Sequence, residues 1–174
     1  MIRRLVIGAA TALGAAAIAE RVLSEASSTP EPIRTFVVID APPDRVWDEI
    51  ADIEGQPRWM TDLKSVEMAP GKTGVGARGI GTVRIFGVPV RDPVTVTAFE
   101  PPRRFAIRHE GTFAGEGTIE LEPGADGTTT IVRWEETIRP PVLPRAGWLV
   151  LRPILRDVFQ ADLHRLRRLI EDGG

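Results

Sequence analysis

The sequence predicts an α+β fold in which a curved antiparallel sheet of about seven strands packs around one long C-terminal helix. Three observations lead to this prediction. Apolar residues recur at helical spacing over 148–170. The chain before this stretch is mostly β-branched and aromatic segments separated by proline and glycine. The apolar stripe of the helix is too wide for a solvated helix, so it needs a concave partner such as a curled sheet.

Length and composition exclude several classes of protein. The 174 residues are typical of one domain with a tail, and the net charge of -2 gives no electrostatic signal for a nucleic-acid partner. There is no cysteine, which excludes disulfides and thiol catalysis. His109 and His164 are the only histidines, and Ser65 is the only serine beyond residue 28. We therefore expect neither a metal site nor a serine triad, and no cofactor.

Residues 1–23 form an N-terminal hydrophobic segment. Arg3 and Arg4 precede the uncharged run 5–19, and Ala-Ile-Ala stands just before Glu20, a pattern typical of a secretory signal. The run is shorter than the ~20 residues that a membrane-spanning helix needs. A cleaved export signal, an uncleaved anchor and an Ala-rich helix on a cytoplasmic protein all remain open. We expect an exported or membrane-anchored protein, with membrane association through residues 1–23, and a cytoplasmic protein as the alternative.

Residues 24–32 are a Ser/Pro/Glu linker, and the folded domain is expected over 33–174. Residues 35–39 predict the first strand. Pro43 suits the first turn of a helix, where the charge of Asp44 is also favourable. The helical repeat that follows consists of Val46, Trp47, Ile50 and Ile53. Pro57 ends this helix, and a second short helix or turn then holds Trp59.

Six more strands and the long helix follow. The strands are predicted at 63–68, 82–88, 94–99, 104–110, 117–122 and 128–139. A glycine-rich loop is predicted at 70–81, and residues 123–127 give a strong turn signal. The apolar stripe of the C-terminal helix consists of Trp148, Leu151, Leu155, Val158, Phe159, Leu163, Leu166 and Ile170. Pro153 lies inside the stripe, which predicts a kink or a short lead-in helix.

The stretch 39–47 and the Pro-x-Trp of Pro57 and Trp59 resemble the opening of the START/polyketide-cyclase superfamily (SRPBCC). Those families typically show a strand, a helix that begins Ala-Pro-x-x-x-Val-Trp, and Pro-x-Trp a little later. Residues 99–105 resemble their Pro-Pro-x-Arg turn. The resemblance covers about 33–171 and implies the helix-grip fold. It implies little about activity, because the superfamily carries cyclases, hydratases, lipid carriers and hormone receptors on one scaffold.

The helix-grip fold implies an apolar cavity between the sheet and the long helix, and strand alternation predicts its lining. The predicted lining residues are Trp59, Arg84, Phe86, Ile107, His109, Phe113, Ile119, Trp134, Glu136 and Phe159. In the strand 82–88, Val83 and Ile85 compete with Arg84 and Phe86 for the inward face. The aromatic residues could instead be ordinary core.

Glu136 and His109 are the candidate catalytic residues. Glu136 shares a face with Trp134 and Ile138, where burial would raise its pKa and suit it to acid–base work. Alternatively, it pairs with an arginine. Glu135 should face solvent, although a register error of one residue would exchange the two roles. His109 is either a general base near neutral pH or the polar end of a strand.

Three functional hypotheses follow. The first is binding of a hydrophobic or amphipathic small molecule, lipid or polyketide-like, in the cavity. The second is a cyclase or dehydratase that uses Glu136 or His109 for proton transfer, with Arg84 stabilising an enolate. The third is a structural domain with a filled cavity. The enzyme hypothesis requires at least two polar groups that converge in one pocket.

Overall fold

A computed structural model describes residues 31–85, 87–112, 114–139 and 145–173. Segment 1–23, nearly all of the linker, Phe86, Phe113 and the side chain of Trp148 lie outside the described residues, so the predictions made for them stay predictions. Within the described ranges, no helix combines the length and the hydropathy that crossing a membrane requires.

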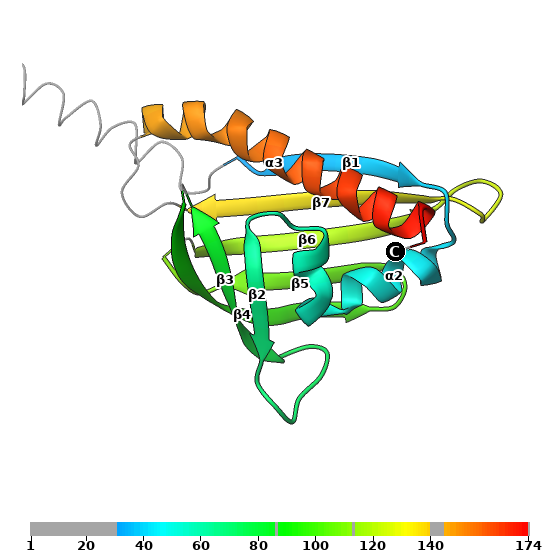
Figure 1. Ribbon diagram of the computed structural model, residues 1–174, viewed down its shortest axis with the longest axis horizontal. Coiled ribbons are helices and arrows are strands. Elements are labelled where there is room, and N and C mark those ends of the chain that lie inside the picture. The colour runs from blue at the N-terminus through cyan, green and yellow to red at the C-terminus, as the bar shows by residue number, and fades with distance from the viewer. Residues whose placement is uncertain (1–30, 86, 113, 140–144, 174) are drawn as a thin grey trace, which may run out of the picture.

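Seven antiparallel strands form one sheet in the order β1-β7-β6-β5-β4-β3-β2 (Figure 1). The strands are β1 (Ile33–Ile39), β2 (Leu63–Met68), β3 (Arg78–Ile85), β4 (Val88–Glu100), β5 (Arg104–His109), β6 (Ala114–Pro123) and β7 (Thr130–Arg139). The helices are α2 (Pro43–Ala51), the 3-10 helix η1 (Ile53–Arg58) and α3 (Arg145–Glu171). The predicted element order, strand count and α+β helix-grip architecture are confirmed.

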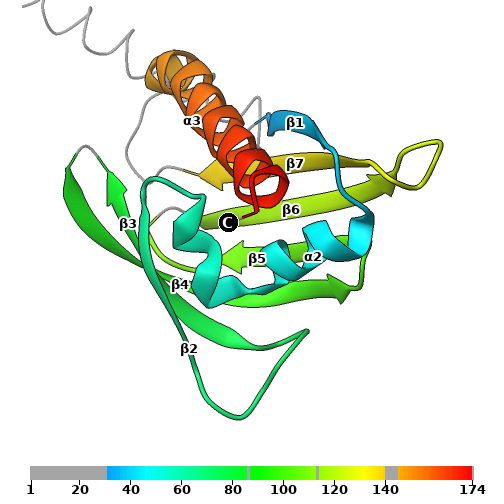
Figure 2. The same cartoon turned by 45° about the vertical axis from the view of Figure 1, so that its right-hand side comes forward.

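Helix α3 lies across one face of the sheet, which we call the inner face (Figures 1 and 2). It packs most extensively on β1. Leu163, Leu166 and Ile170 from the predicted stripe are buried there. The helix runs through Pro153 without interruption, so the expectation of a separate lead-in helix is wrong. Because Pro153 is exposed, the backbone group that loses its partner at this turn can be hydrated.

Alternation along the strands places one row of each on the inner face. In β1, every second residue from Ile33 to Ile39 is buried and the residues between them are exposed. β7 follows the same pattern from Thr130 to Glu136. The inner face, α3, α2 and Trp59 together enclose one continuous hydrophobic core. The predicted period of two is therefore the period that builds the core.

The boundaries of β3 and β4 correct the sequence prediction. β3 begins at Arg78, inside the predicted loop 70–81, and ends at Ile85, before a turn in which Gly87 has φ +85. β4 begins at Val88 and not at residue 94, because the strand continues through Pro89 and Pro93. At the second of these, the Pro93 carbonyl accepts a hydrogen bond of 2.8 Å from the Glu110 N–H, so the proline still contributes an acceptor. The extra length brings Asp92 onto the inner face.

Candidate functional site

Three charged side chains from β4, β5 and β7 meet on the inner face, and we call them the Asp92–His109–Glu136 row. His109 Nδ1 lies 2.5 Å from Asp92 Oδ2, and His109 Nε2 lies 3.2 Å from Glu136 Oε1. Trp134 Nε1 donates a 3.0 Å hydrogen bond to Glu136 Oε2. The exposed fractions of the three side chains are 14% for Asp92, 20% for His109 and 6% for Glu136. The row is therefore a nearly buried set of ionisable groups.

Glycines on β6 allow the row to form. His109 on β5 and Glu136 on β7 belong to strands about 10 Å apart, with β6 between them. Gly115 pairs with His109, and Gly117 pairs with Glu136. A Cβ added at Gly117 would lie 2.5 Å from Glu136 Oε2. The absence of side chains at these positions lets the carboxylate lie across β6 and reach the imidazole.

Replacing Gly117 tests this packing. We expect Gly117→Ala to displace the Glu136 carboxylate from His109, to lower the pKa of His109 and to cost about 1–3 kcal/mol of stability. NMR titration of the imidazole and urea denaturation would measure the two effects. Gly81→Ala is the matched control, because a Cβ there would meet no atom closer than 3.5 Å. An unchanged His109 pKa in Gly117→Ala would contradict this account of the row.

The protonation of His109 differs from the sequence prediction. Burial alone would lower the pKa of His109, but the hydrogen bond to Asp92 and the nearby carboxylates of Asp92 and Glu136 outweigh burial and raise the pKa to about 10. The ring is thus an imidazolium at neutral pH, with a proton on each nitrogen. The expectation of a general base poised near pH 7 is wrong. Each His109 nitrogen already faces a carboxylate. Among the described residues, no group of three or more histidine, aspartate and glutamate side chains is arranged to hold a metal ion.

Glu136 occupies the predicted position. It is 4% exposed on the same face as Trp134, whereas Glu135 lies on the outer face and accepts a 2.7 Å hydrogen bond from Arg34 Nε. The predicted register is therefore confirmed. The alternative in which Glu136 pairs with an arginine is wrong: its polar partners among the described residues are His109 and Trp134.

Arg84 does not line the inner face. It is exposed, while Val83 and Ile85 on either side of it are half-buried. Alternation lets β3 place only one of these two sets inward, and burying the apolar set avoids the cost of desolvating a guanidinium. Arg84 therefore cannot stabilise an enolate on the inner face.

Asp92 is the residue that sequence reasoning missed. The predicted strand began at Val94 and so left Asp92 outside it. Val94 and Val96 are both buried. Extending their period back by two residues places Asp92 on the same face, and this signal could have found it.

An aromatic group lies next to the row. The ring centroid of Trp134 lies 4.7 Å from that of Phe159 on α3 and 6.1 Å from that of Trp59. Trp59 is completely buried. The inner face and its covering elements thus bring together most of the predicted lining residues, namely Trp59, Ile107, His109, Ile119, Trp134, Glu136 and Phe159.

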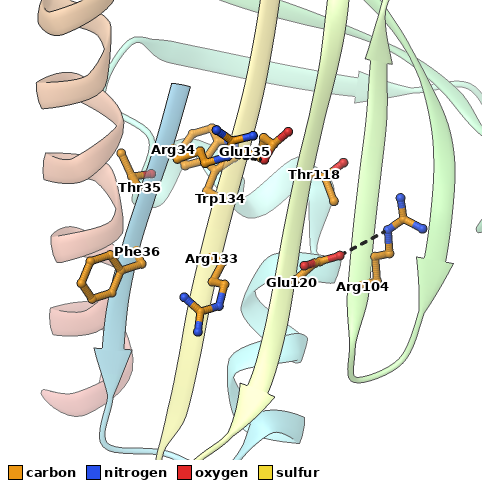
Figure 3. Close-up of a pocket in the computed structure, with 9 residues that line it drawn as sticks. All are labelled: Arg34, Thr35, Phe36, Arg104, Thr118, Glu120, Arg133, Trp134 and Glu135. Carbon is orange, nitrogen blue, oxygen red and sulfur yellow. Dashed lines mark hydrogen bonds and ion pairs between the residues drawn. The ribbon is translucent and has the colours of Figure 1, made fainter. Parts of the chain in front are cut away.

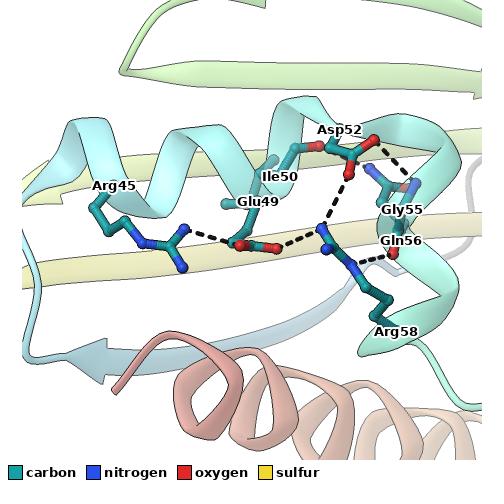
Figure 4. A network of polar contacts seen from close by, with 7 residues as sticks. All are labelled: Arg45, Glu49, Ile50, Asp52, Gly55, Gln56 and Arg58. Atoms are coloured by element: carbon teal, nitrogen blue, oxygen red, sulfur yellow. Dashed lines mark hydrogen bonds and ion pairs between the residues drawn. The ribbon is translucent and has the colours of Figure 1, made fainter. Parts of the chain in front are cut away.

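A network of polar contacts joins α2 to η1, the helix that ends just before Trp59 (Figure 4). The Glu49 carboxylate accepts hydrogen bonds of 2.8 Å from Arg45 Nη1 and 2.7 Å from Arg58 Nη2. Arg58 Nη2 also lies 2.9 Å from Asp52 Oδ2. Because Trp59 directly follows Arg58, this network holds the indole against Trp134.

A second contact ties the segment after Trp59 to α3. Asp162 Oδ1 accepts hydrogen bonds from the Thr61 N–H at 3.0 Å and from the Thr61 hydroxyl at 2.8 Å. Burial raises the pKa of Asp162, and these hydrogen bonds oppose that shift. The segment that carries Trp59 is therefore held on its N-terminal side by the Glu49–Arg58 network and on its C-terminal side by Asp162.

Five buried side-chain atoms lack a hydrogen-bond partner among the described residues. They are Thr35 Oγ1, Trp59 Nε1, Asp92 Oδ1, His109 Nε2 and Glu136 Oε1. His109 Nε2 and Glu136 Oε1 are close enough for an ion pair but are not aligned as a hydrogen bond. All five residues lie on the inner face or pack against it. Buried polar groups without partners are rare, so these atoms distinguish the inner face from an ordinary apolar core.

Two hollows are lined by described residues, and both lie away from the row. One, of about 410 Å³, lies on the outer face of the sheet (Figure 3). Its charges compensate one another: Arg34 pairs with Glu135 at 2.7 Å, and Arg104 lies 3.9 Å from Glu120. The other, of about 430 Å³, lies around Arg58 and the C-terminal end of α3. Neither hollow includes a residue of the Asp92–His109–Glu136 row.

Comparison with known proteins agrees with this architecture. The chain is similar to a solved structure from Deinococcus radiodurans, with 26% identity over 83% of this chain and 100% of that chain and a TM-score of 0.64. A structure from Thermus thermophilus has 22% identity, covers 83% of this chain and 99% of that chain, and has a TM-score of 0.69. A START superfamily protein from Mycobacterium smegmatis has 13% identity, coverage of 83% and 100%, and a TM-score of 0.67.

Among curated proteins, no sequence matches this chain. The family profile described as polyketide cyclase / dehydrase and lipid transport matches residues 32–171, which include all seven strands, α2, η1 and α3. The chain therefore belongs to the polyketide cyclase/dehydrase and lipid transport family.

Proposed function

We propose that the protein binds a hydrophobic or amphipathic small molecule, lipid or polyketide-like, between the inner face and α3. The observation that carries the proposal is the set of buried polar atoms around Trp59, Trp134 and Phe159 that have no facing partner among the described residues, namely Thr35 Oγ1, Trp59 Nε1 and Asp92 Oδ1. Each buried polar atom without a partner costs about 1–3 kcal/mol, so a bound molecule that supplies partners is stabilised by the same amounts. The fold and the family are compatible with such a ligand.

The site has an apolar side and a polar side. Trp59, Trp134 and Phe159 offer ring surface to a hydrocarbon or a fused-ring skeleton. The Asp92–His109–Glu136 row offers charged and hydrogen-bonding atoms to the polar end. This division is typical of pockets that bury a mostly apolar ligand and orient it with a few polar groups.

Binding of the uncharged fluorescent hydrophobe N-phenyl-1-naphthylamine to the full chain tests the proposal. We expect a saturable increase in fluorescence that Trp134→Ala weakens and Trp47→Ala does not. Mass spectrometry of organic extracts of the purified protein would identify the class of any bound molecule. Absence of saturable binding would reject the proposal in favour of a domain whose interior is filled by its own side chains.

A proton-transfer enzyme of the cyclase or dehydratase type is the second candidate. The row meets the requirement that at least two polar groups converge, since His109 and Glu136 lie 3.2 Å apart. In a dehydration, Glu136 would take the proton next to a carbonyl, and the His109 imidazolium would protonate the hydroxyl that leaves as water. A bound molecule recovered after incubation with loss of water would favour this candidate, whereas recovery unchanged would favour simple binding.

A further inference from the structure

We infer that the polar end of the ligand is a hydrogen-bond donor, a protonated amine or a hydroxyl, and that the site discriminates against carboxylate head groups. The inference rests on the proposed binding function and adds the chemistry of the head group. Two independent properties of the row support this inference. One is its charge, and the other is that its unpartnered atoms are mainly hydrogen-bond acceptors.

The row is negative. It contains two carboxylates and one imidazole, so even with the imidazole protonated it keeps an excess negative charge. Arg91 and Arg108, which neighbour Asp92 and His109 in their strands, are exposed on the opposite face. Arg152 of α3 is also paired: its Nη1 lies 2.7 Å from Glu31 Oε2, and its Nη2 donates a 3.2 Å hydrogen bond to the Pro32 carbonyl. Like charge in a nearly buried place disfavours an anionic head.

Other buried acids do not change this balance. Glu49 is paired with two arginines, and Asp162 is bound to Thr61 and lies 3.5 Å from Arg165. A neutral imidazole at His109 would make the row more negative. The sign of the charge at the site therefore does not depend on the protonation of His109.

The unpartnered atoms of the row are mainly hydrogen-bond acceptors. Asp92 Oδ1 and Glu136 Oε1 are buried carboxylate oxygens, which only accept hydrogen bonds when ionised. Glu136 Oε1 faces His109 Nε2 at 3.2 Å, so Asp92 Oδ1 is the acceptor of the row that no donor among the described residues faces. An ammonium supplies three N–H donors and a hydroxyl one, whereas a carboxylate supplies none.

Three probes with the same alkyl chain test the inference on the full-length protein. Dodecylamine, dodecanol and dodecanoate would each compete with bound N-phenyl-1-naphthylamine at neutral pH, below their micelle concentrations. We expect the amine and the alcohol to displace the dye at concentrations at least about tenfold lower than dodecanoate, an advantage of about 1.4 kcal/mol. Dodecanoate competing as well as the other two would overturn the inference and leave the binding proposal standing. Failure of the dye itself to bind would overturn both.

Substitutions of Asp92 and Glu136 test whether the preference for amine over carboxylate head groups arises from the row. Glu136→Gln and Asp92→Asn each remove one negative charge and keep a similar shape, so we expect each to reduce the preference of amine over carboxylate about tenfold. Glu135→Gln is the matched control, because Glu135 is the neighbouring residue on the outer face, and it should leave the preference unchanged. Far-ultraviolet circular dichroism would establish that each variant is folded. An unchanged preference in both folded row variants would overturn the assignment.

Discussion

Raising the pH from about 6.5 to about 10 is expected to destabilise the fold through His109. The pKa of His109 is about 10 in the folded protein, whereas the ordinary value for a histidine side chain is 6.5. A pKa that is raised by folding contributes stability that is fully present below the unfolded value and is lost as the pH rises to the folded value. We therefore expect the free energy of unfolding to fall by about 1.4 kcal/mol per pH unit over this window. Urea denaturation across this pH range would measure the slope.

The composition makes this result easy to assign. The chain has no tyrosine and no cysteine, and lysines stand only at positions 64 and 72, so few other side chains titrate in this range. His109→Gln should remove the slope. His164→Gln is the control: His164 is exposed on α3 with Gln160 at 3.1 Å, and its loss should leave the slope in place. An NMR titration midpoint near 6.5 for His109 would contradict the charged row.

Trp134→Ala is expected to cost about 3–5 kcal/mol, the usual range for removing a large buried aromatic side chain. Trp134 is 6% exposed and packs between Trp59 and Phe159. Its loss also leaves Glu136 Oε2 without its indole donor. Urea denaturation would measure the stability, and binding of N-phenyl-1-naphthylamine would measure the site.

Trp47→Ala separates stability from binding. Trp47 is also 6% exposed, and its ring lies 5.2 Å from Phe99, away from the row. We expect a comparable loss of stability with retention of dye binding and of the raised His109 pKa. Equal loss of dye binding in the two variants would show that the aromatic group beside the row has no special part in binding.

The fold could be predicted because its signals are local. The period of two in 33–39 and the helical stripe of α3 each require only a short stretch of chain, and both reappear as buried faces in the structure. The errors occurred where contacts between distant parts of the chain overrode what a short stretch of sequence predicts. The predicted strand began at residue 94, but in the sheet the Pro93 carbonyl accepts a hydrogen bond from the Glu110 N–H, and the strand extends back to Val88.

Part of the site was also local. Trp134 and Glu136 are two residues apart in one strand, so the sequence alone placed them on one face and Glu135 on the other. The prediction that Arg84 faces inward was wrong because strand alternation allows either Arg84 or its neighbours Val83 and Ile85 to face inward. Packing against the rest of the core decides between these two arrangements. Strand period can tell which residues share a face, but not which face is buried.

The row itself was decided by tertiary structure. Asp92, His109 and Glu136 come from three strands, and the pairing register of β4 through β7 brings them together across the glycines of β6. In isolation His109 would titrate near neutral pH. Two carboxylates delivered by other strands convert it into a buried imidazolium, because the attraction between opposite charges at short range exceeds the cost of burial. The sequence by itself determined the scaffold and placed Glu136 on the same face as Trp134, and only the folded sheet determined which face is buried and what charge the site carries.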